Sequence, residues 1–202
     1  MLTNSAARIY RYIRFRKGYG VHSPFAFGLI NKVIEEKKPF YIFEEIEKKA
    51  PGRRMKVSSP EKYGRLLFRL INFFQAKTVL QIGVSEKIWT EYLSAAAEQL
   101  VVVDQDYLPA MEDACKELNV VDFIFLNVSK DPELTQLLFN HCLGHVHKGT
   151  VLLIDGIHKK KMRKLWQNIK NRNDIPVTMD LYVLGLVFFN KDLHKKNYKL
   201  FF

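Results

Sequence analysis

The sequence predicts a doubly wound α/β fold, in which helices cover both faces of a mostly parallel sheet that ends in an antiparallel hairpin. From residue 77 to residue 171, continuous apolar runs of strand length alternate with segments of helical periodicity. Apolar strands that alternate with helices are typical of a parallel sheet buried on both faces. Residues 177–181 and 186–189 are separated only by a short segment around Gly185, and so short a connection requires antiparallel strands.

Four strand-helix units are expected before this hairpin. The strands are predicted at residues 78–82, 100–104, 121–126 and 150–155, and the helices at residues 85–97, 107–118, 132–143 and 159–171. The last helix carries an apolar stripe at the spacing of a core-facing surface, formed by Met162, Leu165, Trp166 and Ile169. Residues 198–202 are expected to add a final strand at the edge of the sheet.

A helical segment is predicted to precede the sheet. Ser23 and Pro24 form an N-cap followed by proline at the first helical position. Residues 50–60, APGRRMKVSSP, have the composition of a linker and end in a second serine-proline helix start. We therefore divide the chain into an N-terminal helical segment, residues 1–58, and an α/β core, residues 59–202.

The composition is that of a folded protein with one substantial core. The chain has 202 residues, of which 48% are hydrophobic and 26% are charged. Its apolar runs are shorter than the roughly 20 residues needed to cross a bilayer, and Arg8, Arg11 and Arg14 interrupt the place of a signal peptide's apolar region. The only cysteines, Cys115 and Cys142, have no paired framework around them, which favours a reducing compartment. We therefore expect a cytoplasmic protein.

The formal net charge of +11 predicts attraction to an anionic partner. Nucleic acid, anionic lipid headgroups and acidic substrates all fit this charge, and so does a basic surface without a specific partner. No recognised nucleic-acid-binding motif or Walker loop is present. The densest basic run follows the strand predicted at residues 150–155, at the sheet edge where ligands bind. Its cations, which we expect an anionic partner to contact, are Lys159, Lys160, Lys161, Arg163 and Lys164.

A cofactor loop is suggested by the stretch TVLQIGVSEKIW, residues 78–89, which reads as a buried strand, a single glycine and the first turn of a helix. Gly83 lacks a Cβ and therefore allows backbone and ligand to approach closely. Asn127, Asp155 and His158 follow later strands at the carboxyl edge of the sheet. Ligands of open α/β sheets bind at this edge, so these polar side chains are candidate functional groups.

The parallel sheet closed by an antiparallel hairpin resembles the class I S-adenosylmethionine-dependent methyltransferases over about residues 60–202. The likeness looks closest to a small bacterial branch in which a helical segment with Gly-Val-His-Ser-Pro-Phe, here residues 20–25, precedes the core. The family's first motif, Glu-x-Gly-x-x-x-Gly, corresponds to residues 81–87, where Gln81 replaces the acid and Lys87 replaces the second glycine. A cation at Lys87, beside the positive end of a helix, opposes the binding of a sulfonium cofactor.

The resemblance implies S-adenosylmethionine as the cofactor. The family's acidic residue at the end of the second strand accepts hydrogen bonds from ribose hydroxyls, and Asp104 fills this position, although an aspartate after a strand is equally a helix cap. Asp155 and His158 resemble the family's strand-Asp-Asp-Ile-His pattern and are the candidate catalytic residues. The candidate cofactor-binding residues are Gln81, Gly83, Ser85, Asp104 and Asn127.

One departure from the family concerns the shape of the sheet. Seventeen residues lie between Asp104 and Asp122, which is room for a single crossover helix. Family members usually fit a helix, a third strand and a second helix into this interval. We therefore expect the third strand to be missing, the second strand to form the sheet edge, and the cofactor site to be open on one side.

No metal is expected in the site. The run from His141 and Cys142 to His147 contains residue types that zinc prefers, but its spacing fits no standard finger or ribbon. A helix end, where histidines are favoured by the helix dipole, explains the run better. Asn127 with Asp155 offers too few oxygen ligands for a divalent cation.

Two functions remain open at the level of the sequence. The first is methyl transfer from S-adenosylmethionine to an O or N nucleophile, with His158 taking a proton and Asp155 orienting it or the substrate. The second is a methyltransferase fold that has lost catalysis and acts as a binding or scaffold module for an anionic partner. Neither the methyl acceptor nor the oligomeric state follows from the residues.

Overall fold

A computed structural model of the protein describes residues 21–49, 60–83, 86–103, 108–128 and 131–202. Its sheet has seven strands in the order β2-β1-β3-β4-β6-β5-β7. These are β1 (Thr78–Ile82), β2 (Gln99–Val103), β3 (Phe123–Leu126), β4 (Val151–Ile154), β5 (Val177–Asp180), β6 (Gly185–Phe188) and β7 (Lys196–Lys199).

The predicted mixture of parallel and antiparallel strands is confirmed. Strands β2, β1, β3 and β4 run parallel to one another, and β6 is antiparallel to both β4 and β5. Strand β2 lies at the edge of the sheet. Along the described part of the chain only α6 lies between β2 and β3, so the third strand of the family is missing as expected. The final strand β7 pairs parallel with β5 over residues 196–199, which corrects the prediction of a strand at residues 198–202.

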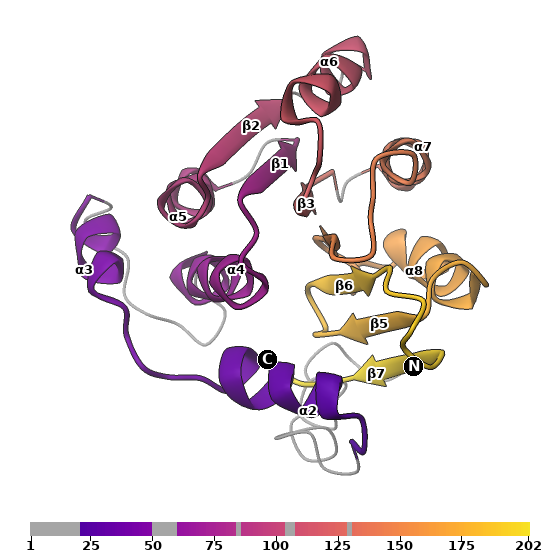
Figure 1. Ribbon diagram of the computed structural model, residues 1–202, viewed down its shortest axis with the longest axis horizontal. Helices are drawn as coiled ribbons and strands as arrows, with labels where there is room; N and C mark the ends of the chain where they lie inside the picture. The colour runs from indigo at the N-terminus through magenta and orange to yellow at the C-terminus, as the bar shows by residue number, and fades with distance from the viewer. Residues whose placement is uncertain (1–20, 50–59, 84–85, 104–107, 129–130) are drawn as a thin grey trace.

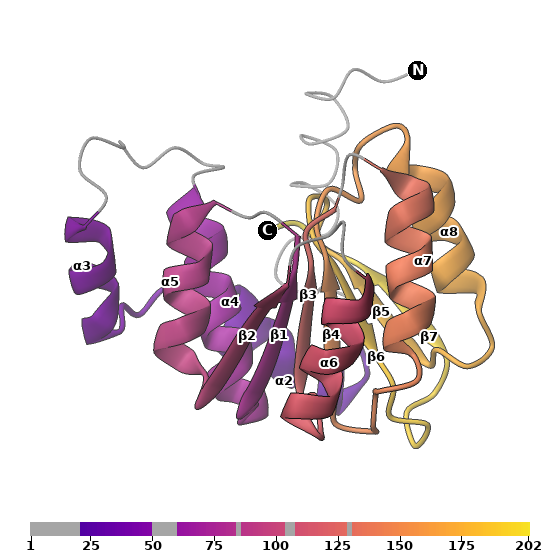
Figure 2. The ribbon, with the colours of Figure 1, turned by 90° about the horizontal axis from the view of Figure 1, so that it is seen from above.

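Eight helical segments surround this sheet in the described residues. They are α2 (Pro24–Leu29), the π-helical η2 (Ile30–Ile34), α3 (Tyr41–Lys48), α4 (Pro60–Phe74), α5 (Lys87–Ala96), α6 (Leu108–Leu118), α7 (Pro132–Cys142) and α8 (Met162–Asn171). Figures 1 and 2 show α2, α4 and α5 on one face of the sheet and α6, α7 and α8 on the other. None of these helices is long and apolar enough to cross a membrane.

The alternation of side chains along the strands creates two apolar cores. In β3 and β4, Phe123, Phe125 and Leu153 pack into the core beneath α4 and α5. Their neighbours Ile124 and Leu152 pack into the other core, beneath α6, α7 and α8. Because successive side chains of a strand point to opposite faces, a strand buried on both faces must be apolar throughout, as these strands are.

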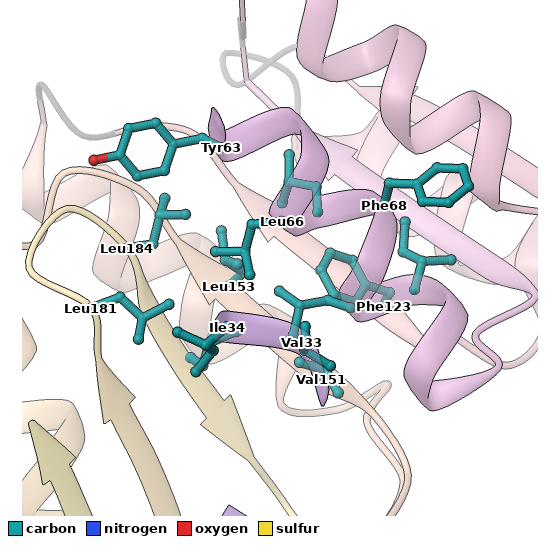
Figure 3. Close-up of a cluster of buried hydrophobic side chains, with 14 of the residues drawn as sticks. Val33, Ile34, Tyr63, Leu66, Phe68, Phe123, Val151, Leu153, Leu181 and Leu184 are labelled. Atoms are coloured by element: carbon teal, nitrogen blue, oxygen red, sulfur yellow. The ribbon is translucent and has the colours of Figure 1, made fainter. Parts of the chain in front are cut away.

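The first described helices contribute to the same core as the sheet. Ser23 Oγ accepts a hydrogen bond from the N–H of Ala26 at 3.4 Å, which confirms the predicted N-cap of α2. Figure 3 shows Val33 and Ile34 of η2 among buried side chains of α4 and β4. The division of the chain at residues 58 and 59 stays a prediction, since residues 50–59 lie outside the described ranges.

Helix α8 begins later than predicted, at Met162 rather than at Lys159. Residues 155–161 form turns, with Gly156 at a φ of 71°. Ile157 is buried, and its N–H donates to the carbonyl of Val183 in the β5–β6 connection at 3.1 Å. This hydrogen bond holds the chain against the hairpin, so helical geometry begins only after the chain has left it.

Candidate functional site

The carboxyl ends of three neighbouring strands bring Gly83, Asn127 and Asp155 to one edge of the sheet. Ile82 pairs with Leu126 and Leu126 with Ile154, so the residue after each strand lies beside its neighbour. The N–H of Asn127 donates to the carbonyl of Ile82 at 2.9 Å, and the N–H of Asp155 donates to that of Leu126 at 3.0 Å. The predicted convergence of these residues is therefore present.

Gly83 is required by the packing of the strand ends themselves. Its φ is 92°, in the left-handed region, and a Cβ there would lie 2.6 Å from the carbonyl oxygen of Asn127. The N–H of Gly83 donates to the carbonyl of Val103 at 2.9 Å and ties β1 to β2. The single glycine of the loop is thus explained by tertiary structure, whether or not a ligand approaches it.

Gln81 lies in the interior. Only 2% of its surface is exposed, and its Oε1 accepts a hydrogen bond from Thr90 Oγ1 of α5 at 3.1 Å. This hydrogen bond joins β1 to the following helix. Lys87 is the exposed first residue of α5. The other two predicted cofactor residues, Ser85 and Asp104, lie outside the described ranges.

Asp155 and His158 lie together in the turns that follow β4. Asp155 is buried at 8% exposure, and its Oδ2 is 4.0 Å from Lys159 Nζ. The His158 ring stacks on Tyr182, with ring centroids 5.1 Å apart and planes 28° from parallel. The Nδ1 atom of His158 is buried and has no hydrogen-bond partner within the described structure.

Burial lowers the pKa of His158 below its usual value of 6.5. The negative charge of Asp155 opposes this shift, whereas the cations Lys159 and Arg163 strengthen it. A lowered pKa keeps the imidazole neutral near neutral pH. A neutral imidazole with an unpaired nitrogen can accept a proton.

Tyr182 was not identified from the sequence, although it forms one side of the site. Its φ is 76°, a conformation uncommon for a side chain of this size, and its N–H donates to Asp180 Oδ1 at 2.9 Å. Trp166 of α8 donates from Nε1 to Asp180 Oδ2 at 3.3 Å. Asp180 thus fixes both the hairpin turn and α8, and holds Tyr182 against His158. The only local feature in the sequence that points to this turn is Asp180, two residues before Tyr182.

Two of the three histidines in the run at residues 141–147 have separate partners. His141 Nε2 lies 3.0 Å from Glu112 Oε1, and His147 Nε2 lies 3.2 Å from Asp122 Oδ1. The described residues contain no group of three or more histidine, cysteine, aspartate or glutamate side chains that could hold a metal ion.

The predicted basic run borders the His158 site. Arg163 Nε donates to the carbonyl oxygen of His158 at 3.2 Å, which fixes the position of α8 relative to the histidine. All five predicted cations are exposed, namely Lys159, Lys160, Lys161, Arg163 and Lys164.

Comparison with known proteins identifies the fold. No family model matches the sequence, and no curated protein matches it. Among solved structures, a methyltransferase from Geobacter sulfurreducens is similar at 15% identity, over 85% of this chain and 98% of that one, with a TM-score of 0.53. A putative O-methyltransferase from Klebsiella pneumoniae shares 14% identity over 80% and 94% of the two chains, with a TM-score of 0.50. The protein has the class I methyltransferase fold.

This methyltransferase fold is also similar to MycE from the mycinamycin biosynthetic pathway, whose structure contains Mg, SAH and mycinamycin VI. The identity is 10% over 88% of this chain and 64% of MycE, with a TM-score of 0.54. At such identities the likeness shows the fold, and function has to be argued from the site.

Proposed function

We propose that this methyltransferase-fold protein transfers a methyl group from S-adenosylmethionine to an O or N nucleophile of an anionic acceptor. The observation that carries the proposal is the buried, unpaired Nδ1 of His158 beside Asp155 at the carboxyl edge of the sheet. A buried nitrogen without a partner costs free energy unless a bound group provides the missing hydrogen bond. A hydroxyl or amine of the acceptor would provide it.

His158 acts as the general base in this proposal. The acceptor's O–H or N–H donates to Nδ1, and the proton moves to the imidazole as the nucleophile's electron pair forms the new bond to carbon. Asp155 then stabilises the imidazolium, since its charge already raises the proton affinity of the ring. Tyr182 limits the orientations of the ring by stacking on it. The remaining contribution is alignment of the two substrates.

The cofactor would lie along the ends of β1, β3 and β4. When bound, S-adenosylmethionine provides a methyl group on a sulfonium sulfur, which leaves as a neutral thioether. Asn127 and Asp155 place polar side chains at this edge, and Gly83 keeps its backbone free of a Cβ. These residues fit a ligand with hydrogen-bonding groups. Roles for Ser85 and Asp104 in cofactor binding stay predictions.

The acceptor carries negative charge in this proposal. The basic run begins directly after His158, its five cations are exposed, and the chain as a whole has a net charge of +11. A field of this sign raises the local concentration of anionic substrates and weakens as ionic strength rises.

Calorimetric titration of the full chain with S-adenosylmethionine and with its demethylated product tests the cofactor. We expect saturable heat and a thermal shift with both ligands, and tighter binding by the Lys87→Gly variant, because it removes a cation beside the loop. No heat and no thermal shift at millimolar ligand would refute the proposal that the protein is a methyltransferase. Salt-sensitive binding to nucleic acid or anionic vesicles would then favour a scaffold that has lost catalysis.

Transfer of tritium from labelled S-adenosylmethionine to phosphorylated and carboxylated phenols and amines tests the reaction. The His158→Gln variant should retain cofactor binding but lose transfer by about 10²- to 10⁴-fold, the usual contribution of a general base. Transfer that is unchanged in this variant would remove His158 from the mechanism.

A further inference from the structure

A cavity of about 430 Å³ lies between the end of η2 and the carboxyl-terminal half of α4. It is separate from the proposed methyl-transfer site. Helix α4 ends at Phe74 and β1 begins at Thr78, so this half of α4 adjoins the amino end of β1. His158 and Asp155 follow the carboxyl end of β4 instead. The cavity volume falls within the roughly 300–1,000 Å³ of small-ligand sites.

The cavity is lined by a buried cation that forms no ion pair with any described residue. Arg69 of α4 is only 7% exposed, and its Nε donates to the carbonyl of Val33 at 2.9 Å. No ion pair joins Arg69 to an acid anywhere in the described ranges. Burial lowers its pKa to about 10, against the opposing charge of Glu36. Removing a charge from water without pairing it is unfavourable, so an anion placed in the cavity would be stabilised by Arg69.

Among the described residues that line the cavity, Glu36 is the only acid, and its carboxylate is engaged with the backbone. Glu36 Oε1 accepts hydrogen bonds from the N–H groups of Lys38 at 2.7 Å and Lys37 at 2.8 Å. The bond from Lys38 is the main reason why the pKa of Glu36 is lowered. With Lys32, Lys38 and Arg69 against this single acid, the lining carries three positive charges and one negative charge.

Two partly exposed aromatic rings form the apolar part of the lining. Phe40 is 42% exposed and Phe73 is 37% exposed. The Phe40 ring packs on Phe68 and Phe43, with centroids 5.0 and 5.3 Å away, so it is held in place while much of it remains accessible. A flat apolar group would cover these rings at little cost in side-chain entropy.

We propose that this cavity binds a small organic anion, a flat apolar ring that carries one carboxylate or phosphate group. The anionic group pairs with the Arg69 guanidinium and with the ammonium groups of Lys38 and Lys32 at the rim. The ring packs against Phe40 and Phe73. Neither the anionic group nor the ring is sufficient alone. Arg69 needs a negative charge to pair with, and the exposed rings of Phe40 and Phe73 need an apolar group to cover them.

The test uses the full chain with four probes: phenyl phosphate, phenylacetate, inorganic phosphate and benzyl alcohol. Calorimetry should show saturable binding of one or both ring-bearing anions, at least about tenfold tighter than binding of inorganic phosphate or benzyl alcohol. Amide chemical-shift changes should be confined to residues 32–40 and 69–73. The better of the two ring-bearing probes distinguishes a phosphate ligand from a carboxylate ligand.

Variants assign the site to named side chains. Arg69→Met should weaken binding about tenfold or more, the effect of losing a charge-assisted hydrogen bond. Since Arg69 also caps η2, the rim variants Lys38→Gln and Phe73→Ala provide a test that keeps this contact, and each should weaken binding several-fold. The matched controls are Lys116→Gln, on α6, and Phe27→Ala, on α2, which change exposed side chains outside the cavity.

The proposal is overturned by any of three results. The first is that neither ring-bearing anion binds. The second is that the amide chemical-shift changes cluster around His158. The third is that both rim variants bind the ring-bearing anions as tightly as the natural sequence does. Binding of inorganic phosphate as tight as that of phenyl phosphate would also overturn it, since the aromatic surface would then have no part.

Discussion

At the scale of the residue, His158 shows how burial and charge set the chemistry of one side chain. It is half-buried, its ring stacks on Tyr182, and two neighbouring cations act against its protonation. Only Asp155 and Asp180 act in the opposite direction. The pKa of the imidazole is therefore lowered, and the neutral form needed for a base prevails near neutral pH.

The pH dependence of His158 follows from the sign of this shift. An NMR titration of its Cε1–H should give a midpoint below 6.5, and the rate of methyl transfer should fall as pH is lowered through that midpoint, because imidazolium cannot accept a proton. Asp155→Asn should lower the midpoint further, since it removes the charge that favours the proton. A midpoint above 6.5 would contradict the inferred environment.

Gly64 provides a second prediction at the residue scale. A Cβ on Gly64 would collide with the ring of Tyr92, which is fully buried between α4 and α5. Gly64→Ala should therefore lower the free energy of unfolding by about 1–3 kcal/mol, the usual cost of overpacking.

The control for Gly64 is Gly28→Ala in α2, where no atom lies within 4 Å of the added Cβ. This change should be neutral, or stabilising by up to about 1 kcal/mol, because alanine favours helix more than glycine does. Denaturant unfolding measures both variants. Equal stability of the two would show that α4 and α5 are not packed closely at Gly64.

At the scale of the element, Glu47 joins three helices. Arg65 of α4 donates from Nε and from its terminal nitrogen to the two carboxylate oxygens, each at 2.7 Å, and Tyr92 of α5 donates to Oε1 at 2.5 Å. Burial raises the pKa of Glu47, but the bonds from Arg65 and Tyr92 outweigh it and the net shift is downward. These bonds hold α3 against α4 and α5.

Glu47→Gln tests this junction. The substitution removes the charge and one acceptor from a partly buried bidentate pair, so the free energy of unfolding should fall by about 1–3 kcal/mol. Glu44→Gln, one turn earlier in α3, breaks only the exposed pair with Lys48 and should change stability by less than about 0.5 kcal/mol. Similar effects of the two variants would show that the junction contributes little.

At the scale of the whole molecule, two carboxylates couple distant parts of the fold to pH. Glu47 joins the helices. Asp122, directly before β3, accepts hydrogen bonds from the N–H groups of Lys77 and Thr78 at the amino end of β1, and so joins the two strands. Burial opposes ionisation of Asp122, but these bonds lower its pKa below 3.8, and the pKa of Glu47 lies below 4.5. Both carboxylates therefore bind protons more weakly in the folded chain than in the unfolded chain.

The molecule should lose stability on acidification for this reason. Where the unfolded chain binds more protons, the free energy of unfolding falls as pH falls, so the stabilisation is present above about pH 4.5 and is lost as pH falls through the folded pKa values. Urea unfolding at a series of pH values measures it, and Glu47→Gln should show a shallower dependence. A stability that is flat between pH 5 and pH 3 would contradict this account.

Much of the fold could be predicted because its signals are local. The strands read as apolar runs since the two faces of each strand are buried, and Ser23 reads as a cap since its partner is three residues away. The short interval between Asp104 and Asp122 left no room for another strand, which placed β2 at the edge. The position of Gly83, Asn127 and Asp155 at one edge of the sheet could be predicted, because the carboxyl ends of parallel strands lie at the same edge.

The details of the site and of the cavity were decided by tertiary structure alone. Tyr182 meets His158 across 24 positions of sequence, and Arg69 meets Val33 across 36. Such contacts have no periodic pattern, since they depend on how separate elements pack. The sequence thus determined the sheet and the edge at which ligands bind, because burial and chain length act locally. Only packing decided that, among the described residues, His158 Nδ1 at this edge has no hydrogen-bond partner and Arg69, in the separate cavity beside α4, has no ion pair.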